Sequence, residues 1–191
     1  MFILTVNQDI TLKQLDINDA APLFQLTDES RETLRTWLSW VDQTKTINDS
    51  RAFIELASKQ FIDRSGLTTG IMYHGQLAGI VGFNLFNWLN NSGTIGYWLG
   101  SRYEGKGIMT RAASSLIDYG FKSLALNRIE IRAASENQKS RAIPERLGFV
   151  KEGRLRQTEW LYDHYVDHVI YSMLTEEWPS ARNSLKPDWK H

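Results

Sequence analysis

The spacing of apolar side chains along the chain changes between the period of a helix and that of a strand. Residues 10–15 alternate and predict a first strand, with Asp16 or Asn18 as the cap of a helix that follows. A second helical stretch is expected over 34–41 and a third over 50–62. The third helix is expected to place its apolar side chains on one broad face: Phe53, Ile54, Leu56, Ala57, Phe61 and Ile62.

The middle of the chain has the period of strands and then returns to that of a helix. Residues 67–73 and 77–84 predict two strands joined by a short turn that contains glycine, which is typical of a hairpin. Another strand is expected over 94–99 and ends at Gly100. The most regular helical pattern of the chain begins after Gly107, with apolar positions at i, i+3, i+4 and i+7.

The last third of the chain predicts further strands around one short helix. A strand is expected over 128–134, a helix over 137–147, and a final hairpin formed by 149–161 and 166–174. The complete order is a strand, helices, and then β-β-β-α-β-α-β-β. This order predicts an α+β fold with a mixed, mostly antiparallel sheet and helices on both faces.

Length and composition limit the number of domains and the kinds of partner. The chain has 191 residues without an internal repeat, so one domain is expected over 1–178 with a tail over 179–191. Lys plus Arg equals Asp plus Glu at 22 each, and no run of like charges suggests a nucleic-acid partner. The beginning of the chain does not resemble a signal peptide, and no apolar run approaches the roughly 20 residues of a membrane span. A cytoplasmic protein without a membrane partner is expected.

The absence of cysteine narrows the possible chemistry. It excludes disulfide bonds, a thiolate nucleophile and a metal held by thiolates. The four histidines do not form a ligand pair on one helix face, because His164 and His168, which have a suitable spacing, lie in the predicted hairpin. No metal ion is therefore expected.

The segment 102–107, between a predicted strand and a predicted helix, suggests a site for a phosphate group. A glycine-rich turn that opens a helix presents unpaired backbone N–H groups and the positive end of the helix dipole to one point. Its two glycines let an anion approach the main chain, its two cations add charge, and a threonine in the first helical turn can donate a hydroxyl. The residues assigned to this site are Arg102, Gly105, Lys106, Gly107, Ile108 and Thr110.

The spacing of these glycines alone does not identify a ligand. It matches neither the G-x-G-x-x-G loop of dinucleotide-binding proteins nor the P-loop of nucleotide triphosphatases. An ordinary strand-to-helix turn that needs glycine explains the bare spacing equally well. The motifs on either side are needed to decide between the two.

Those motifs, taken together, resemble the GNAT superfamily of N-acetyltransferases. Arg102-x-x-Gly105-x-Gly107 is preceded by Ile95-Gly96-Tyr97-Trp98 and followed, about thirty residues later, by Asn137-x-x-Ser140 and Leu147-Gly148-Phe149. Within the superfamily the chain is most similar to the RimJ/RimL group, which acetylates the N-termini of ribosomal proteins. The resemblance implies acetyl-CoA as the acetyl donor and direct transfer in a ternary complex.

The resemblance also implies a particular sheet and a particular assembly. The two halves of the sheet are expected to splay apart at the strand that ends near Leu99, with the pantetheine arm of the cofactor in the gap. Main-chain groups of Trp98 and Leu99 are expected to bind the pantetheine and the thioester carbonyl. A homodimer or a larger homo-oligomer is expected as well.

Two residues are candidates for the chemistry of transfer. Glu159 lies in a strand that is otherwise apolar and aromatic near Trp160 and Leu161, where partial desolvation suits a base, and it matches the glutamate proposed as the base of RimL-like proteins. Ser140 matches the serine proposed to protonate the leaving sulfur, and Asn137 is a candidate contact of the pantetheine. Many superfamily members carry a tyrosine acid where this chain has Pro144. Alternatively, Glu159 is a solvated edge residue, and Asn137 and Ser140 only begin a helix.

The acceptor is predicted from the acidity of amines. An α-amine with a pKa near 7.7 is about one-sixth neutral at pH 7, whereas lysine is neutral in roughly one part in 2,500. A protein N-terminus is therefore favoured, with a polyamine or aminoglycoside as the alternative acceptor and a non-catalytic acyl-CoA-binding module as the alternative of another class. The possible walls of the acceptor site, where core packing is the alternative for the tryptophans, are Trp37, Trp40, Asn84, Trp88, Asp163 and Asp167.

Overall fold

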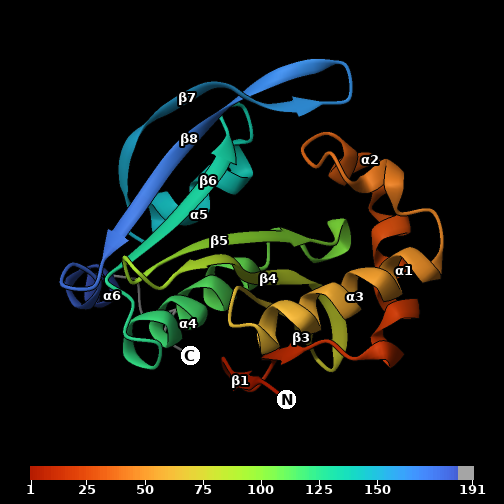
Figure 1. Ribbon diagram of the computed structural model, residues 1–191, viewed down its shortest axis with the longest axis horizontal. Helices are drawn as coiled ribbons and strands as arrows, with labels where there is room; N and C mark the ends of the chain where they lie inside the picture. Colours follow the sequence, from red (N-terminus) through yellow and green to blue (C-terminus); the bar gives the residue numbers. More distant parts are fainter. Residues whose placement is uncertain (185–191) are drawn as a thin grey trace.

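The computed structural model describes residues 1–184, which form one eight-stranded sheet flanked by helices (Figure 1). In chain order the strands are β1 (Ile3–Thr5), β2 (Ile10–Gln14), β3 (Leu67–Tyr73), β4 (Gln76–Asn87), β5 (Ser92–Leu99), β6 (Arg128–Ala134), β7 (Val150–Leu161) and β8 (His164–Leu174). The helices are α1 (Ala20–Glu29), α2 (Arg31–Arg35), α3 (Ile47–Ile62), α4 (Ile108–Lys122), α5 (Gln138–Arg146) and α6 (Trp178–Ser184). Short 3-10 turns lie at Ile17–Asp19, Val41–Gln43 and Ser101–Tyr103.

The sheet is split in its middle. Its strand order is β1-β2-β3-β4-β5-β6-β8-β7, and every neighbouring pair is antiparallel except β5 and β6. The parallel ladder of β5 and β6 joins only Ser92–Ile95 to Arg128–Ile131, after which the two strands diverge (Figure 1). The expected mostly antiparallel sheet that opens near Leu99 is confirmed, and the opening begins at Gly96.

The two faces of the sheet are covered by different helices. On β4, Phe83 is fully buried beneath α4, and a Cβ atom at Gly120 of α4 would lie 2.7 Å from its ring. Glycine is required there because the helix lies so close to the sheet. Ile80 and Gly82 alternate with Phe83 and face the opposite side, where α1 and α3 lie. The expected helices on both faces are confirmed.

The helix expected over 34–41 is wrong beyond Arg35, where α2 ends. Three carbonyl groups of the following segment accept hydrogen bonds from side chains. Arg31 donates from its two terminal nitrogens to the carbonyls of Val41 and Thr44, at 2.7 Å each. The hydroxyl of Tyr162 donates to the carbonyl of Leu38 at 2.6 Å. Arg31 thus binds this segment from the start of α2 and Tyr162 from a distant part of the chain, and the segment forms a turn.

The broad apolar face expected on the third helix is only partly buried. Ile54 and Ala57 of α3 belong to the core, whereas Phe53, Leu56 and Ile62 are 40%, 57% and 77% exposed. Phe53 and Leu56 instead line the cleft described below. Within residues 1–184, no helix combines the length and the apolar character needed to cross a membrane.

The first part of the expected tail forms α6, which packs on the domain. Trp178 is 2% exposed, and its indole N–H donates to Asp118 of α4 at 2.8 Å. Ala181 packs against the hydrophobic core. Residues 179–184 therefore continue the packed structure, and the rest of the expected tail, 185–191, lies outside the described residues.

One ion pair fastens the edge strand β7 and offers a test of the fold. Glu152 of β7 accepts hydrogen bonds at 2.7 Å from both Arg128 of β6 and Ser172 of β8. These bonds, chiefly the one from Arg128, lower the pKa of Glu152 from 4.5 to about 2. A carboxyl whose folded pKa is depressed stabilises the fold above its unfolded pKa and loses this contribution as the pH falls towards the folded value.

We expect Glu152→Gln to lower the free energy of unfolding by about 1 kcal/mol at pH 7, since solvent screens a carboxylate that is 40% exposed. The difference from the unchanged protein should shrink steadily as the pH falls from 4.5 towards 2. Urea unfolding at pH 7, 4.5 and 3 measures it. A difference that stays constant over this range would show that the ionised form of Glu152 does not stabilise the fold.

Candidate functional site

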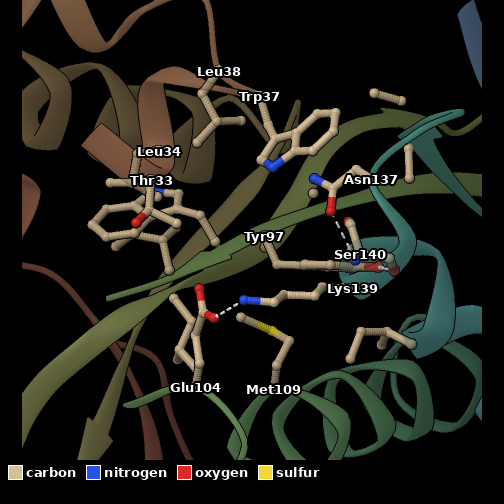
Figure 2. Close-up of a pocket in the computed structure, with 18 of the residues that line it drawn as sticks. Thr33, Leu34, Trp37, Leu38, Tyr97, Glu104, Met109, Asn137, Lys139 and Ser140 are labelled. Carbon is tan, nitrogen blue, oxygen red and sulfur yellow. Dashed lines mark hydrogen bonds and ion pairs between the residues drawn. The ribbon is translucent and has the colours of Figure 1, made fainter. Parts of the chain in front are cut away.

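A cavity of about 1820 Å³ extends through the split in the sheet. On one side it is lined by α1, α3 and the segment that contains α2, and on the other by the start of α4 and by α5. Figure 2 shows Trp37 and Leu38 on one wall, Glu104 and Met109 on the facing wall, and Asn137 and Ser140 beside them. The split therefore provides one continuous cleft lined by elements from both faces of the sheet.

The edge of β5 presents main-chain groups to this cleft. Gly100 donates its N–H to the carbonyl of Ala78 at 2.8 Å, and the unbroken register of β4 and β5 places Trp98 opposite Ile80. Because hydrogen-bonding direction alternates along an antiparallel strand, Trp98 directs its main-chain groups to β4. Tyr97 and Leu99 direct theirs into the gap. Leu99 therefore has the direction that its expected main-chain contact requires, as does Tyr97, whereas the main-chain groups of Trp98 face β4.

The cradle at the start of α4 has the backbone that its glycines were expected to allow. Gly105 and Gly107 have φ angles of 76° and 68°, in the left-handed region. Gly107 is the N-cap of α4, and no side chain caps the first turn. The N–H groups of Ile108 and its neighbours are therefore available to an anion at the positive end of a 15-residue helix. A Cβ atom at Gly105 would meet no atom within 4 Å, so the approach is open.

Two arginines that the sequence did not single out reinforce the cradle. Arg111, one turn into α4, donates to the carbonyl of Lys106 at 3.0 Å, and its buried Nε has no hydrogen-bond partner among residues 1–184. Arg146 of α5 donates to the hydroxyl of Thr110 at 3.0 Å, and both residues line the cleft. A buried guanidinium nitrogen without a partner fits an anionic ligand such as a pyrophosphate. Helical spacing from Gly107 could have indicated Arg111, but Arg146 depends on the packing of α4 against α5.

The two cations assigned to the cradle from the sequence differ in their placement. Lys106 lines the cleft, with its ammonium 5.7 Å from the ring centroid of Tyr103. Arg102 does not line it, because its guanidinium pairs with Glu29 of α1 at 3.0 Å and lies over the ring of Tyr103. The structure thus brings Lys106 to the cleft and directs Arg102 away from it.

An ion pair crosses the cleft beside the cradle. Glu104 accepts from the ammonium of Lys139 on α5 at 2.6 Å (Figure 2). The pair neutralises a carboxylate that would otherwise repel an anion at the first turn of α4. The Lys139 side chain is 81% exposed, so this contact involves little desolvation.

Asn137 and Ser140 begin α5 and line the cleft together with Tyr97. The Asn137 side chain accepts the N–H of Ser140 at 3.1 Å, which is an N-cap, and the Ser140 carbonyl accepts the hydroxyl of Tyr97 at 2.8 Å. The hydroxyl of Ser140 makes no hydrogen bond within the described chain, so it is free to act on a ligand. Burial raises the pKa of Tyr97, which therefore remains a neutral donor. Pro144 lies inside α5, as expected.

Glu159 lies on β7 and lines the same cleft as Ser140. It is half-buried, and both of its carboxylate oxygens have partners. One accepts the hydroxyl of Ser39 at 3.2 Å, and the other lies 2.8 Å from Nε2 of His168. The expectation of a partly desolvated carboxylate is therefore met, and His168 is a neighbour that the sequence pattern did not indicate.

The expected walls of the acceptor site separate into two groups. Trp37, Trp40 and Asn84 line the cleft, and Trp40 packs against Trp98 with ring centroids 5.9 Å apart. The other three do not line it. Trp88 donates its indole N–H to the carbonyl of Arg64, Asp163 is 87% exposed beside His164, and Asp167 binds neighbouring residues of β7.

The described residues show no metal site in or beside the cleft. Within 1–184, no group of three or more His, Asp or Glu side chains is placed to hold a metal ion. The polar groups that line the cleft are hydroxyls, amides, main-chain groups and charged side chains. They are suited to an anionic ligand and to proton transfer.

Comparison with known proteins identifies a family and several relatives. Residues 9–150 match the family described as the acetyltransferase (GNAT) domain. The chain is 37% identical over 183 residues to the putative ribosomal N-acetyltransferase YdaF of Bacillus subtilis, which covers 95% of this chain and 100% of the relative.

Two solved structures are similar over nearly their whole length. The microcin C7 self immunity acetyltransferase MccE, in complex with acetyl-CoA and AMP, has a TM-score of 0.85 and 33% identity, over 88% of this chain and 94% of that one. The ribosomal L7/L12 alpha-N-protein acetyltransferase RimL, in complex with coenzyme A, has a TM-score of 0.88 and 25% identity, over 91% and 98%.

Proposed function

The chain belongs to the acetyltransferase (GNAT) domain family and is an acetyl-CoA-dependent N-acetyltransferase, and from this premise we propose that its acceptor is the N-terminal α-amine of a protein, with ribosomal proteins as the first candidates. The observation that carries the choice of acceptor is the apolar and aromatic wall of the cleft, which lies beside the carboxylate of Glu159. The names of the relatives support the same choice.

Acetyl-CoA fits the residues on the donor side of the cleft. The unpartnered Nε of Arg111 and the open approach at Gly105 suit its pyrophosphate. Main-chain groups of Tyr97 and Leu99, which no strand of the sheet pairs on the cleft side, suit the pantetheine arm. Bound there, acetyl-CoA supplies the acetyl group as a thioester.

In this proposal each step of the transfer has its own residue. Glu159 accepts the proton of the attacking amine, and the Leu99 N–H polarises the acetyl carbonyl as the nitrogen–carbon bond forms. The Ser140 hydroxyl donates a proton to the sulfur as the carbon–sulfur bond breaks. No covalent acetyl-enzyme is needed, and the chain contains no cysteine that would form one.

The acceptor side of the cleft suits one amine beside apolar side chains. Trp37, Phe53 and Leu56 line it, and the latter two are exposed hydrophobic residues of α3. Three other carboxylates line the cleft and are already engaged by neighbouring groups: Asp49, Glu104 and Glu136. A polyamine presents several cations that need several carboxylates, whereas a peptide presents a single α-amine.

The proposal is tested by comparing acceptors under identical conditions. Acetyl transfer would be measured by mass spectrometry with three acceptors: a peptide with a free N-terminus, the same peptide with a blocked N-terminus and an internal lysine, and spermidine. We expect kcat/KM for the free N-terminus to exceed the others by about tenfold or more, since only its amine is substantially neutral at pH 7. Faster transfer to spermidine than to every peptide would overturn the proposal and favour a small-amine acceptor.

Candidate proteins follow from a second measurement. Extracted ribosomal proteins would be incubated with the enzyme and isotopically labelled acetyl-CoA, and their N-terminal peptides would be sequenced by mass spectrometry. We expect label on the α-amine of a small number of proteins. Label confined to lysine side chains would contradict an N-terminal specificity.

A further inference from the structure

We infer that His168 is a positioning residue for acetyl transfer, which acts by holding the carboxylate of Glu159 towards the acceptor. The inference rests on the proposed role of Glu159 as the base. Its basis is the contact of 2.8 Å between His168 Nε2 and Glu159 Oε2 inside the cleft, where the two side chains are 19% and 31% exposed. Because an ionised carboxylate only accepts hydrogen bonds, this nitrogen carries the proton and donates it.

A β-bulge creates this contact. Leu155 of β7 lies opposite His168 of β8, but Glu159 lies opposite Val166. Three residues of β7, 156–158, therefore face one residue of β8, Asp167. In a regular hairpin Glu159 would lie opposite His164, four residues away from His168. The bulge moves Glu159 along β8 to a position diagonal to His168 on the same face, since Val166 and His168 share a face.

The bulge is fixed by two hydrogen bonds that residues of β7 donate to Asp167 of β8. Gln157, at its centre, has a φ angle of 50° and donates its N–H to Asp167 at 2.7 Å. Arg154 donates to the other carboxylate oxygen of Asp167 at 2.6 Å. The two contacts, first the one from Gln157, lower the pKa of Asp167, which therefore stays ionised as their acceptor. A local distortion supported in this way is typical of strands next to an active site.

Glu159 is held from two independent parts of the fold. His168 approaches one carboxylate oxygen from β8, while Ser39, in the turn after α2, donates to the other at 3.2 Å. The backbone neighbours of His168 are Ala134 of β6 and Leu155 of β7, neither of which competes for its ring. The remaining lone pairs of the carboxylate are then directed to the cleft, where the amine of the acceptor lies.

The test uses two polar replacements of similar size. In His168→Gln the side-chain amide nitrogen reaches the place of Nε2 and can donate to Glu159, whereas in His168→Asn the amide is too short to do so. We expect His168→Asn to lower kcat about tenfold or more, because the lost hydrogen bond is made to a charged group, with the KM for acetyl-CoA unchanged within about twofold. His168→Gln should recover most of the rate. His164→Gln is the matched control, since His164 lies on the same hairpin and contacts only exposed Asp163, and it should leave the rate unchanged.

The following outcomes decide the inference. If His168→Gln and His168→Asn are equally slow, or if His168→Asn is as fast as the unchanged enzyme, His168 does not position Glu159. Glu159→Gln combined with His168→Asn should be no slower than Glu159→Gln alone, and additive losses would also refute a role through Glu159. If Glu159→Gln itself leaves transfer unchanged, the proposed base fails, and the positioning role fails with it. If Glu159→Gln is slow and His168→Asn is fast, the positioning role of His168 is refuted, while the proposed role of Glu159 as the base stands.

Discussion

Gly105→Val is expected to weaken acetyl-CoA binding by about 100-fold or more, measured by calorimetry. Gly105 has a φ angle of 76° at the entrance to the cradle, and the place of its missing Cβ is open. A branched side chain would project into the space that the phosphates need, and it would disfavour the left-handed backbone that directs the N–H groups to them. Loss of several charge-assisted hydrogen bonds accounts for an effect of this size.

Gly75 offers a matched control for this substitution. It has a φ angle of 77° in the turn between β3 and β4, and a Cβ atom there also meets nothing within 4 Å. Gly75→Val should therefore carry the same backbone strain, roughly 1–2 kcal/mol, without reaching the cleft. We expect thermal unfolding to show similar losses of stability in both variants and only Gly105→Val to lose affinity. Equal affinity of the two variants would mean that the cradle does not bind the cofactor.

Glu159→Gln is expected to lower kcat by about 100-fold while acetyl-CoA affinity stays within about threefold, since general-base catalysis contributes at least that much. The amide keeps the size of the side chain and can still bind Ser39 and His168, but it cannot accept a proton from the amine. Single-turnover transfer to a peptide, with calorimetry of acetyl-CoA binding, measures the two quantities. Residual activity should rise with pH, because the α-amine then loses its proton to solvent before attack.

Glu55→Gln is the control for the change of charge. Glu55 is exposed on α3 and does not line the cleft, so its replacement should leave both quantities unchanged. If Glu159→Gln retained full transfer, another group would have to accept the proton. If it lost acetyl-CoA affinity as well, Glu159 would have a role in the donor site rather than in proton transfer.

Most strands were predictable from the sequence, because each shows a local alternation of apolar and polar side chains. Arg128–Ala134 has the expected bounds, and α4 begins directly after Gly107, as its glycine and apolar spacing indicated. The segment after α2 was not predictable, because Arg31 and Tyr162 bind its carbonyls from elsewhere in the fold. The strand β1 was missed because three residues carry too little pattern, and it forms only by pairing with β2.

The candidate site was predictable to the extent that its motifs are contiguous. The cradle at Gly105 and Gly107 and the N-cap at Asn137 lie where a turn meets a helix, which the sequence shows directly. The direction of the Arg102 side chain was not predictable, because it depends on the ion pair with Glu29 of α1, which is distant in the sequence. The contact between Glu159 and His168 depends on the register of a hairpin, and no local pattern indicates a bulge that shifts it.

The split between β5 and β6 also bears on aggregation through strand edges. Gly96–Leu99 is a strand edge without a strand partner on its cleft side, and an exposed edge of this kind is a template for pairing with a second chain. Here the edge is recessed in a cleft that is also lined by Trp37, Trp40 and residues of α5, so it is less accessible to an incoming strand than an edge at the outside of a sheet. A flexible thread such as pantetheine needs far less width than a polypeptide strand with side chains. The recessed edge thus favours a narrow ligand, and the geometry that admits the cofactor also hinders pairing with a second strand.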